Sequence, residues 1–420
     1  MKGLESLSAS TSRPGIGPSY DGQPGGNRPL DVDLTGIAPA SGGGVESVAV
    51  GVVQGLFELG LRPRCLVSVG TAGSWAKQFP GSVPDFMEVA SIFRAESVWQ
   101  TALRRVLPTR WKTSNMVGLV RRLRARSTER LLRSGATWFP FHRAIARAQT
   151  AVVTVHDLRV FEAGLASEMD QSIIRENVSR AKAVICSWAH PYEHLIRLFP
   201  DAEEKVFRIA LPVLNCGPAV KAHELSSGPI MLFLPASVTP HKNHELVLRA
   251  MAEREQLHLT CTGLEVEPFA SELKQVAADL GVADRVTWLG YVDTAALEGE
   301  YQKADILVMP SRWEAASGPI FEAIVRELPF VASSIPPIKS QLVDLNLNAP
   351  TFDCDSVPEI LVALDEVIGN YAQYRNELRG PARFLRSRTW KDTAEEYLQV
   401  FDWASGHARK PEYLQKKVKK

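Results

Sequence analysis

The chain has 420 residues, with 45% apolar and 23% charged side chains, and its 48 basic residues nearly balance 47 acidic ones for a net charge of +1. This composition excludes a disordered or fibrous chain. The near-neutral balance gives no general reason to expect nucleic acid as a partner, because that binding rests on many phosphate contacts. The length exceeds one ordinary core, so we expect two domains of about 150 to 200 residues with a cleft between them.

The first half of the chain begins with a leader, residues 1–30, that is rich in Ser, Gly and Pro and is expected to be disordered. Beyond it, short β-branched or aliphatic runs alternate with amphipathic stretches, which is typical of βα units in a parallel sheet. The expected strands are 32–37, 64–69, 151–156, 183–187 and 205–211. We therefore predict a first doubly wound α/β domain over residues 31–211.

A linker is predicted at residues 212–228, which contain two prolines and two glycines. A second αβ series over residues 229–385 predicts another doubly wound domain. Its expected strands are 230–234, 257–261, 285–289, 306–309 and 330–332, and helices are expected at 357–368, 371–385 and 389–401. Residues 386–420 are expected to form a helix that returns to the first domain, followed by a basic tail.

The segment DILVMPSRWEAASGPIFEA indicates a buried strand that ends at Pro310, a loop of small residues, and a helix that begins near Pro319. Ligands of open α/β sheets bind at such strand ends, and amides of a helix start can approach a phosphate or sugar oxygen. Glu314 precedes the loop and Glu322 lies one turn inside the helix, so both carboxylates could accept hydroxyl hydrogen bonds from one extended ligand. The alternative is an ordinary helix-start acid at Glu322 and a solvated acid at Glu314.

The arrangement PSRWEAASGPIFEA resembles the E-x7-E signature of family-four retaining glycosyltransferases of the GT-B fold (glycosyl transferases group 1), mannosyltransferase-like members included. The resemblance implies two Rossmann-like domains that face each other across a cleft. It also implies that Glu314 contacts sugar hydroxyls and that Glu322 binds the nucleotide ribose. The main chain that would hold sugar and phosphate is that of Ser317, Gly318, Pro319 and Ile320. The family's usual glycine and phenylalanine are replaced by Ala315 and Ala316.

A second motif, LFLPASVTPHKNHELVLRAM, places Lys242 after a strand and its loop, with Asn243 at the expected start of a helix. Lysine there can stabilise a diphosphate leaving group as a point charge. The motif is similar to the family's KNxxxLxxA pattern, which implies that Lys242 and Asn243 face the donor. Ser237 stands where many members have an arginine, so the diphosphate would depend on Lys242, helix amides and His241. The alternative is a surface lysine near a helix terminus.

The segment DRVTWLGYVD resembles the family's segment that bounds the nucleobase pocket, which implies that Tyr291 and Val292 lie beside the base. Aromatic residues usually serve packing, so Trp288 is expected to be a core residue at a sheet edge, and Tyr291 could be one too.

Two sites are expected in the first domain. The resemblance places the loop of residues 42–44, with Gly43 and Gly44, beside the donor diphosphate and the acceptor. A nicotinamide site is the rival interpretation, but the spacing is not GxGxxG. His156 ends an apolar strand, and the resemblance implies that it hydrogen-bonds the transferred sugar. A structural cap made with Asp157 is the alternative.

No metal is expected to be required. Two DxD triplets occur, but 31–33 opens the first strand and 353–355 lies near the end of the second domain, and Lys242 and helix dipoles already stabilise charge without a metal. Near His156 and Asp157, a metal site would need more ligands than the sequence shows. The five cysteines are scattered without a CxxC pair, which is typical of a reducing cytoplasm. There is no amino-terminal secretion pattern and no run of about 18 apolar residues. We therefore expect a cytoplasmic protein that is neither secreted nor membrane-spanning.

A basic stretch at residues 104–133 contains ten Lys and Arg side chains and one acid, with leucines among them, and basic residues end the chain at 416–420. Such a stretch can rest on an anionic membrane surface at the inner face of the membrane. A solvated helix face is an equal alternative, and nucleic acid is a third.

Taken together, the motifs predict a retaining hexosyltransferase that needs no cofactor and uses a GDP- or UDP-hexose, with mannose from GDP-mannose as the first candidate. The acceptor would be a saccharide or a lipid-linked saccharide. His156, Lys242 and Glu314 are the expected catalytic residues, and no side chain is an evident nucleophile, so we expect front-face attack by the acceptor hydroxyl. The alternatives are a noncatalytic nucleotide-sugar scaffold or sensor and a nucleotide-sugar epimerase.

Overall fold

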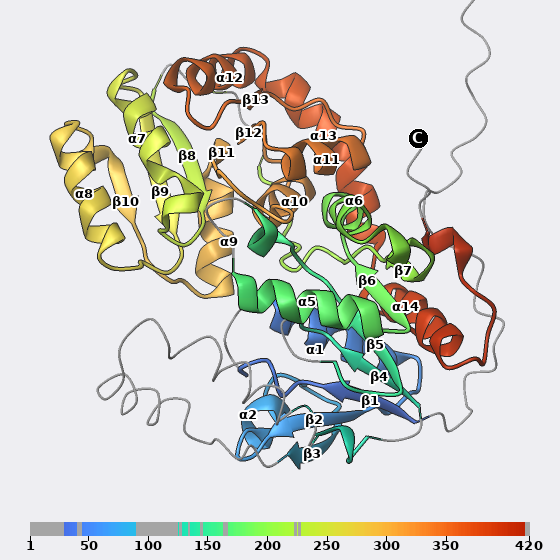
Figure 1. Cartoon of the computed structure of the whole chain (residues 1–420). Coiled ribbons are helices and arrows are strands. Elements are labelled where there is room, and N and C mark those ends of the chain that lie inside the picture. The colour runs from blue at the N-terminus through green and yellow to red at the C-terminus, as the bar shows by residue number, and fades with distance from the viewer. Residues whose placement is uncertain are drawn as a thin grey trace, which may run out of the picture.

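The computed structural model describes residues 29–39, 44–89, 125, 128–132, 135–142, 146–162, 167–221, 225 and 228–415. Two parallel sheets, each covered by helices, form two domains (Figure 1). The first sheet has the order β3-β2-β1-β4-β5-β6-β7, with β1 at Leu30–Asp33, β2 at Arg64–Ser68, β3 at Asp85–Val89, β4 at Ala136–Phe139, β5 at Thr150–Thr154, β6 at Ala183–Cys186 and β7 at Val206–Arg208. The second has the order β10-β9-β8-β11-β12-β13, with β8 at Ile230–Pro235, β9 at Leu257–Thr262, β10 at Val286–Trp288, β11 at Ile306–Met309, β12 at Phe330–Ser333 and β13 at Thr351–Phe352.

The helices follow the strands along the chain. In the first half they are α1 (Gly44–Glu58), α2 (Ala72–Ala76), α5 (Glu168–Arg180) and α6 (Ala189–Leu198), with 3-10 helices at Arg159–Phe161 and Pro200–Lys205. In the second half they are α7 (His244–Ala252), α8 (Phe269–Asp279), α9 (Thr294–Lys303), α10 (Gly318–Val325), α11 (Pro336–Asp344), α12 (Val357–Gly369), α13 (Tyr371–Ser387) and α14 (Trp390–Ala404), with 3-10 helices at Pro240–Lys242, Ala283–Arg285 and Glu412–Leu414. None of these described helices has the length and apolarity needed to cross a bilayer.

All ten expected strands are present, nine of them with shifted ends, and three strands were missed. The missed strands are β3, β4 and β13. β3 has the sequence DFMEV and lies at the sheet edge with charged, partly exposed positions, while β13 has only two residues, so neither carries a clear apolar pattern. β1 ends four residues earlier than predicted, because the Asp33 carboxylate accepts hydrogen bonds from the amide and hydroxyl of Thr35 and turns the chain.

Strands inside both sheets are mostly apolar and fully buried. β4, β6, β11 and β12 are buried at every residue, as expected for parallel strands that helices cover on both faces. Burial of this kind contributes about 25 cal/mol per Å² of apolar surface and is the main stabilising term of each domain. The ends of these strands, by contrast, lead into the loops that carry the polar motifs.

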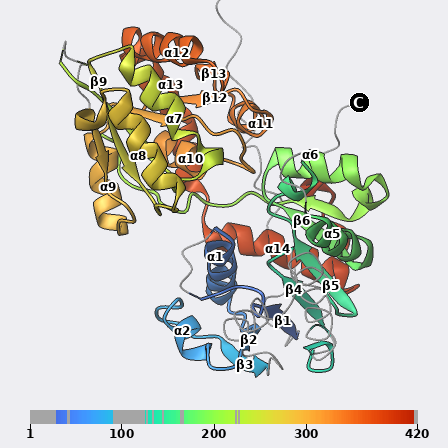
Figure 2. The same ribbon diagram turned by 60° about the vertical axis from the view of Figure 1, so that its left-hand side comes forward.

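Helix α14 completes the first core although it follows the second domain in sequence. It packs along α1, and Figure 2 shows the two helices side by side in the first domain. The fit is close at Gly55, where an added Cβ would lie 2.2 Å from the Trp390 carbonyl oxygen. Inside the core, Trp138 Nε1 donates to Thr154 Oγ1 (2.9 Å), which lies 3.3 Å from the Tyr397 hydroxyl of α14.

The chain crosses between the domains twice, after β7 and before α14, and hydrogen bonds join the two crossing segments. The carbonyl oxygen of Ala210, just after β7, accepts hydrogen bonds from Arg388 Nε (3.0 Å), Arg388 Nη2 (2.8 Å) and Thr393 Oγ1 (3.1 Å). Arg388 also forms an ion pair with Glu396, which is mostly buried. The path out of the first domain and the path back into it are therefore held at one point.

The structure begins β1 at Leu30, the last residue of the expected leader. The rest of the leader up to residue 28, residues 42 and 43 of the glycine loop, most of the basic stretch at 104–133 and the basic tail at 416–420 lie outside the described residues.

A pair of glycine substitutions tests the α1–α14 contact. We expect Gly55→Ala to lower the free energy of unfolding by about 1–3 kcal/mol, because the new methyl group overlaps the main chain of α14. The matched control is Gly299→Ala in α9, where an added Cβ meets nothing within 4 Å, so helix propensity should raise stability by up to about 1 kcal/mol. Chemical denaturation measures both, and equal effects at the two sites would contradict the close packing.

Candidate functional site

An ion pair joins two motifs that lie 72 residues apart. Lys242 Nζ lies 2.6 Å from Glu314 Oε1, and Ser311 Oγ donates to the same oxygen at 2.8 Å. Lys242 follows β8 and Glu314 follows β11, and these strands are neighbours in the second sheet. Because parallel strands end at the same sheet edge, the register of the sheet brings the two side chains together.

Both members of this pair are shielded from water. The side chain of Lys242 is 18% exposed and that of Glu314 is 9% exposed. Removing one member of a shielded pair leaves the other charge uncompensated, which is strongly unfavourable, whereas an anionic ligand can take over the contact of the cation. The site thus holds a positive and a negative group in a fixed relation at the strand ends.

Asn243 holds strand ends together. It has left-handed backbone geometry (φ 55°), which Asn tolerates better than most residues. Its side-chain Nδ2 donates to the carbonyl oxygens of Pro310 (3.1 Å) and Cys354 (2.7 Å), and the side chain is buried. Both bonds go to the main chain that follows β11 and β13, so Nδ2 is occupied, and the donor contact of Asn243 stays a prediction.

The start of α10 is fixed by a side chain that the sequence analysis did not identify. The Ser317 amide donates to Gln341 Oε1 (3.0 Å), and Gln341 Nε2 donates to the Ser317 carbonyl oxygen (3.0 Å). The Ser317 amide is thus occupied, and Pro319 has no N–H, so the predicted contacts of these two residues with a donor do not come from their amides. The first-turn amides that lack an intrahelical acceptor by helix geometry are those of Gly318 and Ile320.

Glu322 is held by a buried tyrosine. The Tyr301 hydroxyl donates to Glu322 Oε2 at 2.8 Å, and Tyr301 is fully buried. Burial raises the pKa of Glu322 above its ordinary value, and the hydrogen bond from Tyr301 opposes that rise. Glu322 is therefore a positioned group and not a solvated helix-start acid.

A buried arginine packs against Tyr301 and holds it in place. The Arg326 guanidinium lies 4.1 Å from the centre of the Tyr301 ring, and Arg326 Nε donates to Glu298 Oε2 at 3.0 Å. The sequence spacing of Glu322 and Arg326 predicts an i,i+4 ion pair. Instead, Arg326 donates to the main-chain oxygen of Glu322 (2.9 Å), which leaves the carboxylate to Tyr301.

His156 of the first domain has a fixed tautomer. Its Nε2 lies 2.7 Å from the Pro140 carbonyl oxygen, so that nitrogen carries the proton and donates. Burial lowers the pKa of His156 below its ordinary value, which keeps the ring neutral near pH 7. The other ring nitrogen, Nδ1, is therefore an acceptor. The main-chain N–H of His156 donates to His142 Nδ1 at 3.2 Å.

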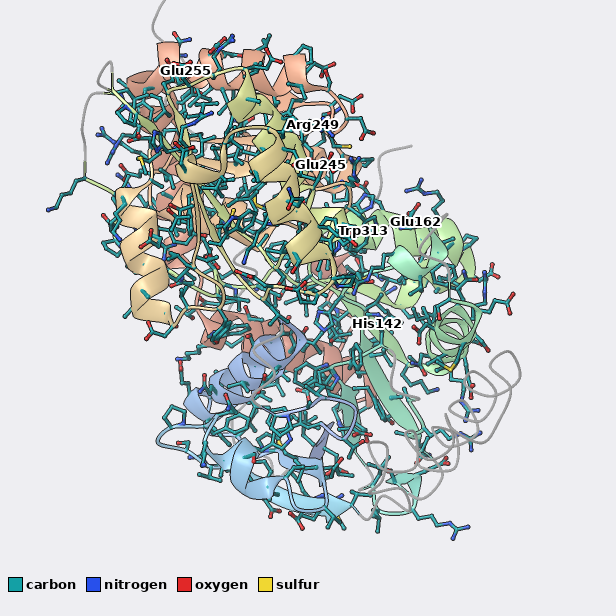
Figure 3. The ribbon with its side chains drawn as sticks, turned by 90° about the vertical axis from the view of Figure 1, so that its left-hand side faces the viewer. His142, Glu162, Glu245, Arg249, Glu255 and Trp313 are labelled. Atoms are coloured by element: carbon teal, nitrogen blue, oxygen red, sulfur yellow. The ribbon has the colours of Figure 1, made fainter. Side chains whose placement is uncertain are left out.

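An arginine of the first domain reaches over the loop of the second. The Arg159 guanidinium lies 5.3 Å from the centre of the Trp313 ring and 3.7 Å from Asp157 Oδ1. Figure 3 shows Trp313 at the boundary between the domains, on the side of His142 and Glu162. Because Trp313 directly precedes Glu314, this contact brings the segment after β5 close to the Lys242–Glu314 pair. Arg159 and Trp313 are further residues that sequence reasoning missed, since no spacing rule pairs them.

The comparison with known proteins assigns the second domain. Residues 219–383 match the family model described as Glycosyl transferases group 1. The chain carries a group 1 glycosyltransferase domain. The O-antigen chain mannosyltransferase RfbU of Salmonella typhimurium is 26% identical over 202 residues, which are 46% of this chain and 55% of that protein. The chain thus spans about half the length of this curated relative.

Solved structures match both domains of the chain. HepE of Anabaena, in complex with UDP and glucose, is 13% identical with a TM-score of 0.64 and covers 88% of this chain and 98% of its own. Sucrose-phosphate synthase from Thermosynechococcus elongatus is 15% identical with a TM-score of 0.66 and covers 91% of this chain and 100% of its own. The predicted GT-B fold of two Rossmann-like domains is confirmed.

The remaining predicted donor residues follow strands or begin helices. Ser237 is half-buried after β8, and Gly263 approaches it closely, since an added Cβ at Gly263 would lie 2.6 Å from the Ser237 nitrogen. Tyr291 is 79% exposed after β10, and Val292 is half-buried. Gly44 is exposed at the first residue of α1, while Gly43 lies outside the described residues.

Trp288 is packed as expected for a residue at a sheet edge. It is half-buried in the edge strand β10, against the core of the second domain.

The two DxD triplets have other partners. Asp31 accepts two hydrogen bonds from Arg64, at 2.9 and 2.8 Å. In the part of the chain that the structure describes, the group of side chains with metal-ligand proximity is Asp353, Cys354 and Asp355. Asp355 pairs with Arg312, and Asp353 accepts the Asp355 amide at 2.9 Å.

His244 at the start of α7 predicts how stability depends on pH. It is fully buried beside Trp288, and burial lowers its pKa from 6.5 to about 4. The unfolded chain binds a proton at this residue below about pH 6.5 and the folded chain does not, so stability is lost as the pH falls from there toward 4. We expect the wild type to lose up to about 3 kcal/mol more than His244→Phe between pH 7 and pH 4.

Urea unfolding at several pH values measures this difference. Other buried histidines, such as His156 and His241, shift in the same direction in both proteins and cancel in the comparison. Parallel stability curves for the two proteins would contradict the assignment to His244.

Proposed function

We propose that this chain transfers a hexose from a nucleoside diphosphate sugar to a hydroxyl group of a saccharide or lipid-linked acceptor, with retention at the anomeric carbon and without a metal. The observation that carries the proposal is the shielded Lys242–Glu314 pair at the strand ends of a group 1 domain, with Glu314 in the loop that leads to Gly318, the exposed first residue of α10. A cation, a carboxylate and helix amides in one place are what a sugar diphosphate requires: charge stabilisation for phosphate and acceptors for hydroxyls.

In this proposal the second domain binds the donor. Lys242 contacts the diphosphate, and the amides of Gly318 and Ile320 contact phosphate and sugar oxygens. Glu314 accepts hydrogen bonds from hydroxyl groups of the hexose. Glu322, whose carboxylate is fixed by Tyr301, accepts hydrogen bonds from hydroxyl groups of the ribose. The nucleobase lies beside Tyr291 and Val292, and the exposure of Tyr291 leaves an aromatic face for stacking.

The first domain supplies contacts to the transferred hexose and to the acceptor substrate. His156 Nδ1 carries no proton, so it would accept a hydrogen bond from a hydroxyl of the transferred hexose. The loop with Gly43 and Gly44 would approach the diphosphate. The acceptor oxygen forms a bond to the anomeric carbon on the face from which the diphosphate departs, and its proton passes to a leaving phosphate oxygen. Lys242 stabilises the negative charge that develops there.

Two donors are the first candidates. GDP-mannose is favoured by the mannosyltransferase name of the relative RfbU, and a UDP-hexose by the HepE complex with UDP and glucose. If the acceptor is lipid-linked, residues 104–133 would be the part of a cytoplasmic enzyme that meets an anionic membrane surface. A noncatalytic nucleotide-sugar sensor is the second candidate, because Ser237 offers no cation to the diphosphate.

Calorimetric titration with GDP and UDP tests the donor site. We expect one of the two nucleotides to bind the wild type. Glu322→Ala should weaken the affinity for that nucleotide at least about 10-fold, because the ribose hydroxyls lose a positioned hydrogen-bond acceptor. The matched control is Glu245→Ala, an exposed acid on α7 that pairs with Arg249 and is labelled in Figure 3. Unchanged affinity in Glu322→Ala, or an equal loss in the control, would count against the assigned pocket.

Turnover of GDP-mannose and UDP-glucose tests the role of Lys242. We expect Lys242→Ala to lower kcat by about 10²–10³, because the departing diphosphate loses its cation. Lys303→Ala, which removes an exposed lysine at the end of α9, serves as the control and should leave kcat within about twofold. Binding without turnover in the wild type would favour the sensor over the enzyme.

A further inference from the structure

Gln341 is a buried side chain of α11 that makes two hydrogen bonds to a single residue of the loop between β11 and α10, which we call the donor loop. Its Oε1 accepts from the Ser317 amide and its Nε2 donates to the Ser317 carbonyl oxygen, both at 3.0 Å. The side chain is 5% exposed. A primary amide is suited to this contact because it offers one acceptor and one donor side by side, and the partners fix which atom is oxygen.

The residue that Gln341 holds determines where the helix amides point. Ser317 is the N-cap of α10 and has extended backbone geometry (φ −89°, ψ 104°), and its side chain makes no capping hydrogen bond. The first amides of a helix have no acceptor within it, so their direction depends on how the N-cap residue is held. Gln341 supplies both contacts to the main chain of Ser317 and therefore sets the direction of the Gly318 and Ile320 amides.

The opposite end of the loop is anchored from the same part of the chain. Ser333, at the end of β12, donates its hydroxyl to the Ser311 carbonyl oxygen at 2.5 Å. Ser311 in turn donates to Glu314. The loop between β11 and α10 is thus fixed at its first residues by Ser333 and at its last residue by Gln341, and both anchors are buried.

Helix α11 also meets the first domain. It packs against α6, as Figure 1 shows, and Asp344 at its end forms an ion pair with Arg208 of β7. The helix that positions the donor loop is therefore part of the contact between the domains.

We propose that Gln341 is a positioning residue of the donor site, which holds the Ser317 peptide so that the Gly318 and Ile320 amides face the β-phosphate and sugar of the donor. This inference rests on the proposed function and adds a residue that acts through the loop without touching the substrate. It assigns to Gln341 an effect on the sugar-phosphate end of the donor and none on the nucleoside end.

Gln341→Glu is a sharp test because the two protonation states of the new carboxyl group differ in one hydrogen bond, the one donated to the Ser317 carbonyl oxygen. A protonated carboxyl group can accept from the Ser317 amide and donate to the Ser317 carbonyl oxygen, as the native amide does. A carboxylate cannot donate and would place a negative charge against that oxygen. Burial raises the pKa of such a carboxyl above about 4.3, so the variant should resemble the wild type at low pH and lose its function as the pH rises.

The experiment measures donor turnover, as release of GDP or UDP with water as acceptor, from pH 5 to pH 8. GDP-mannose and UDP-glucose are both tried, and affinity for GMP and UMP is measured by calorimetry at each pH. The proteins are the wild type, Gln341→Glu, Gln341→Leu and the control Gln399→Glu. Gln399 lies on α14 and only accepts a hydrogen bond, from Tyr413, which a carboxylate can also accept.

We expect the kcat of Gln341→Glu relative to wild type to fall at least 10-fold between the two ends of this pH range. Gln341→Leu should be slow throughout, and the control should follow the wild type. Monophosphate affinity should stay within twofold in all four proteins, which also reports that the domain is folded.

Each other outcome overturns a stated claim. A constant ratio of Gln341→Glu to wild type at every pH, or a parallel loss of monophosphate binding, would contradict the role of Gln341 while leaving the proposed function intact. A wild type that turns over neither donor would instead overturn the proposed function and this inference with it.

Discussion

The contact between Lys242 and Glu314 is the interaction on which the donor site depends, because it joins the ends of two neighbouring strands with opposite charges in a place that water reaches poorly. The parallel sheet makes this contact possible, since β8 and β11 end at the same edge. Asn243 keeps the edge together through its bonds to Pro310 and Cys354. A sugar diphosphate placed here would meet a cation and a carboxylate that are already oriented, so little reorganisation is needed during transfer.

The two glutamates of the signature are held by different means, which suits different tasks. Glu314 is paired with a cation and accepts a hydroxyl from Ser311, whereas Glu322 receives a neutral hydrogen bond from Tyr301. Burial raises the pKa of Glu322, which a nearby diphosphate would raise further by repulsion of like charges. The stacking of Arg326 on Tyr301 limits the freedom of that hydroxyl. Each carboxylate is thus fixed before a ligand arrives.

Several elements with a short apolar run were predicted from the sequence, although β4, which is also buried at every residue, was missed. The strand 306–309 was predicted with its observed ends, because ILVM is apolar throughout and Pro310 follows it. β3 was missed because charged residues interrupt an edge strand. The motifs located Lys242, Glu314 and Glu322, but not their supports: Gln341 lies 24 residues from Ser317, and Tyr301 lies 21 residues from Glu322. Such contacts are set by tertiary packing, which no residue spacing reveals, and so the occupied Ser317 amide and the inward Asn243 side chain were not foreseen.

A crystal structure of the chain with bound GDP-mannose or UDP-glucose would show whether the donor lies at the Lys242–Glu314 pair. We expect the diphosphate at the carboxyl ends of β8 and β11, with Lys242 Nζ on a phosphate oxygen, Glu314 on a hexose hydroxyl and Glu322 on the ribose. A nucleotide sugar bound elsewhere, with the Lys242–Glu314 contact unchanged and no ligand atom near it, would contradict this placement.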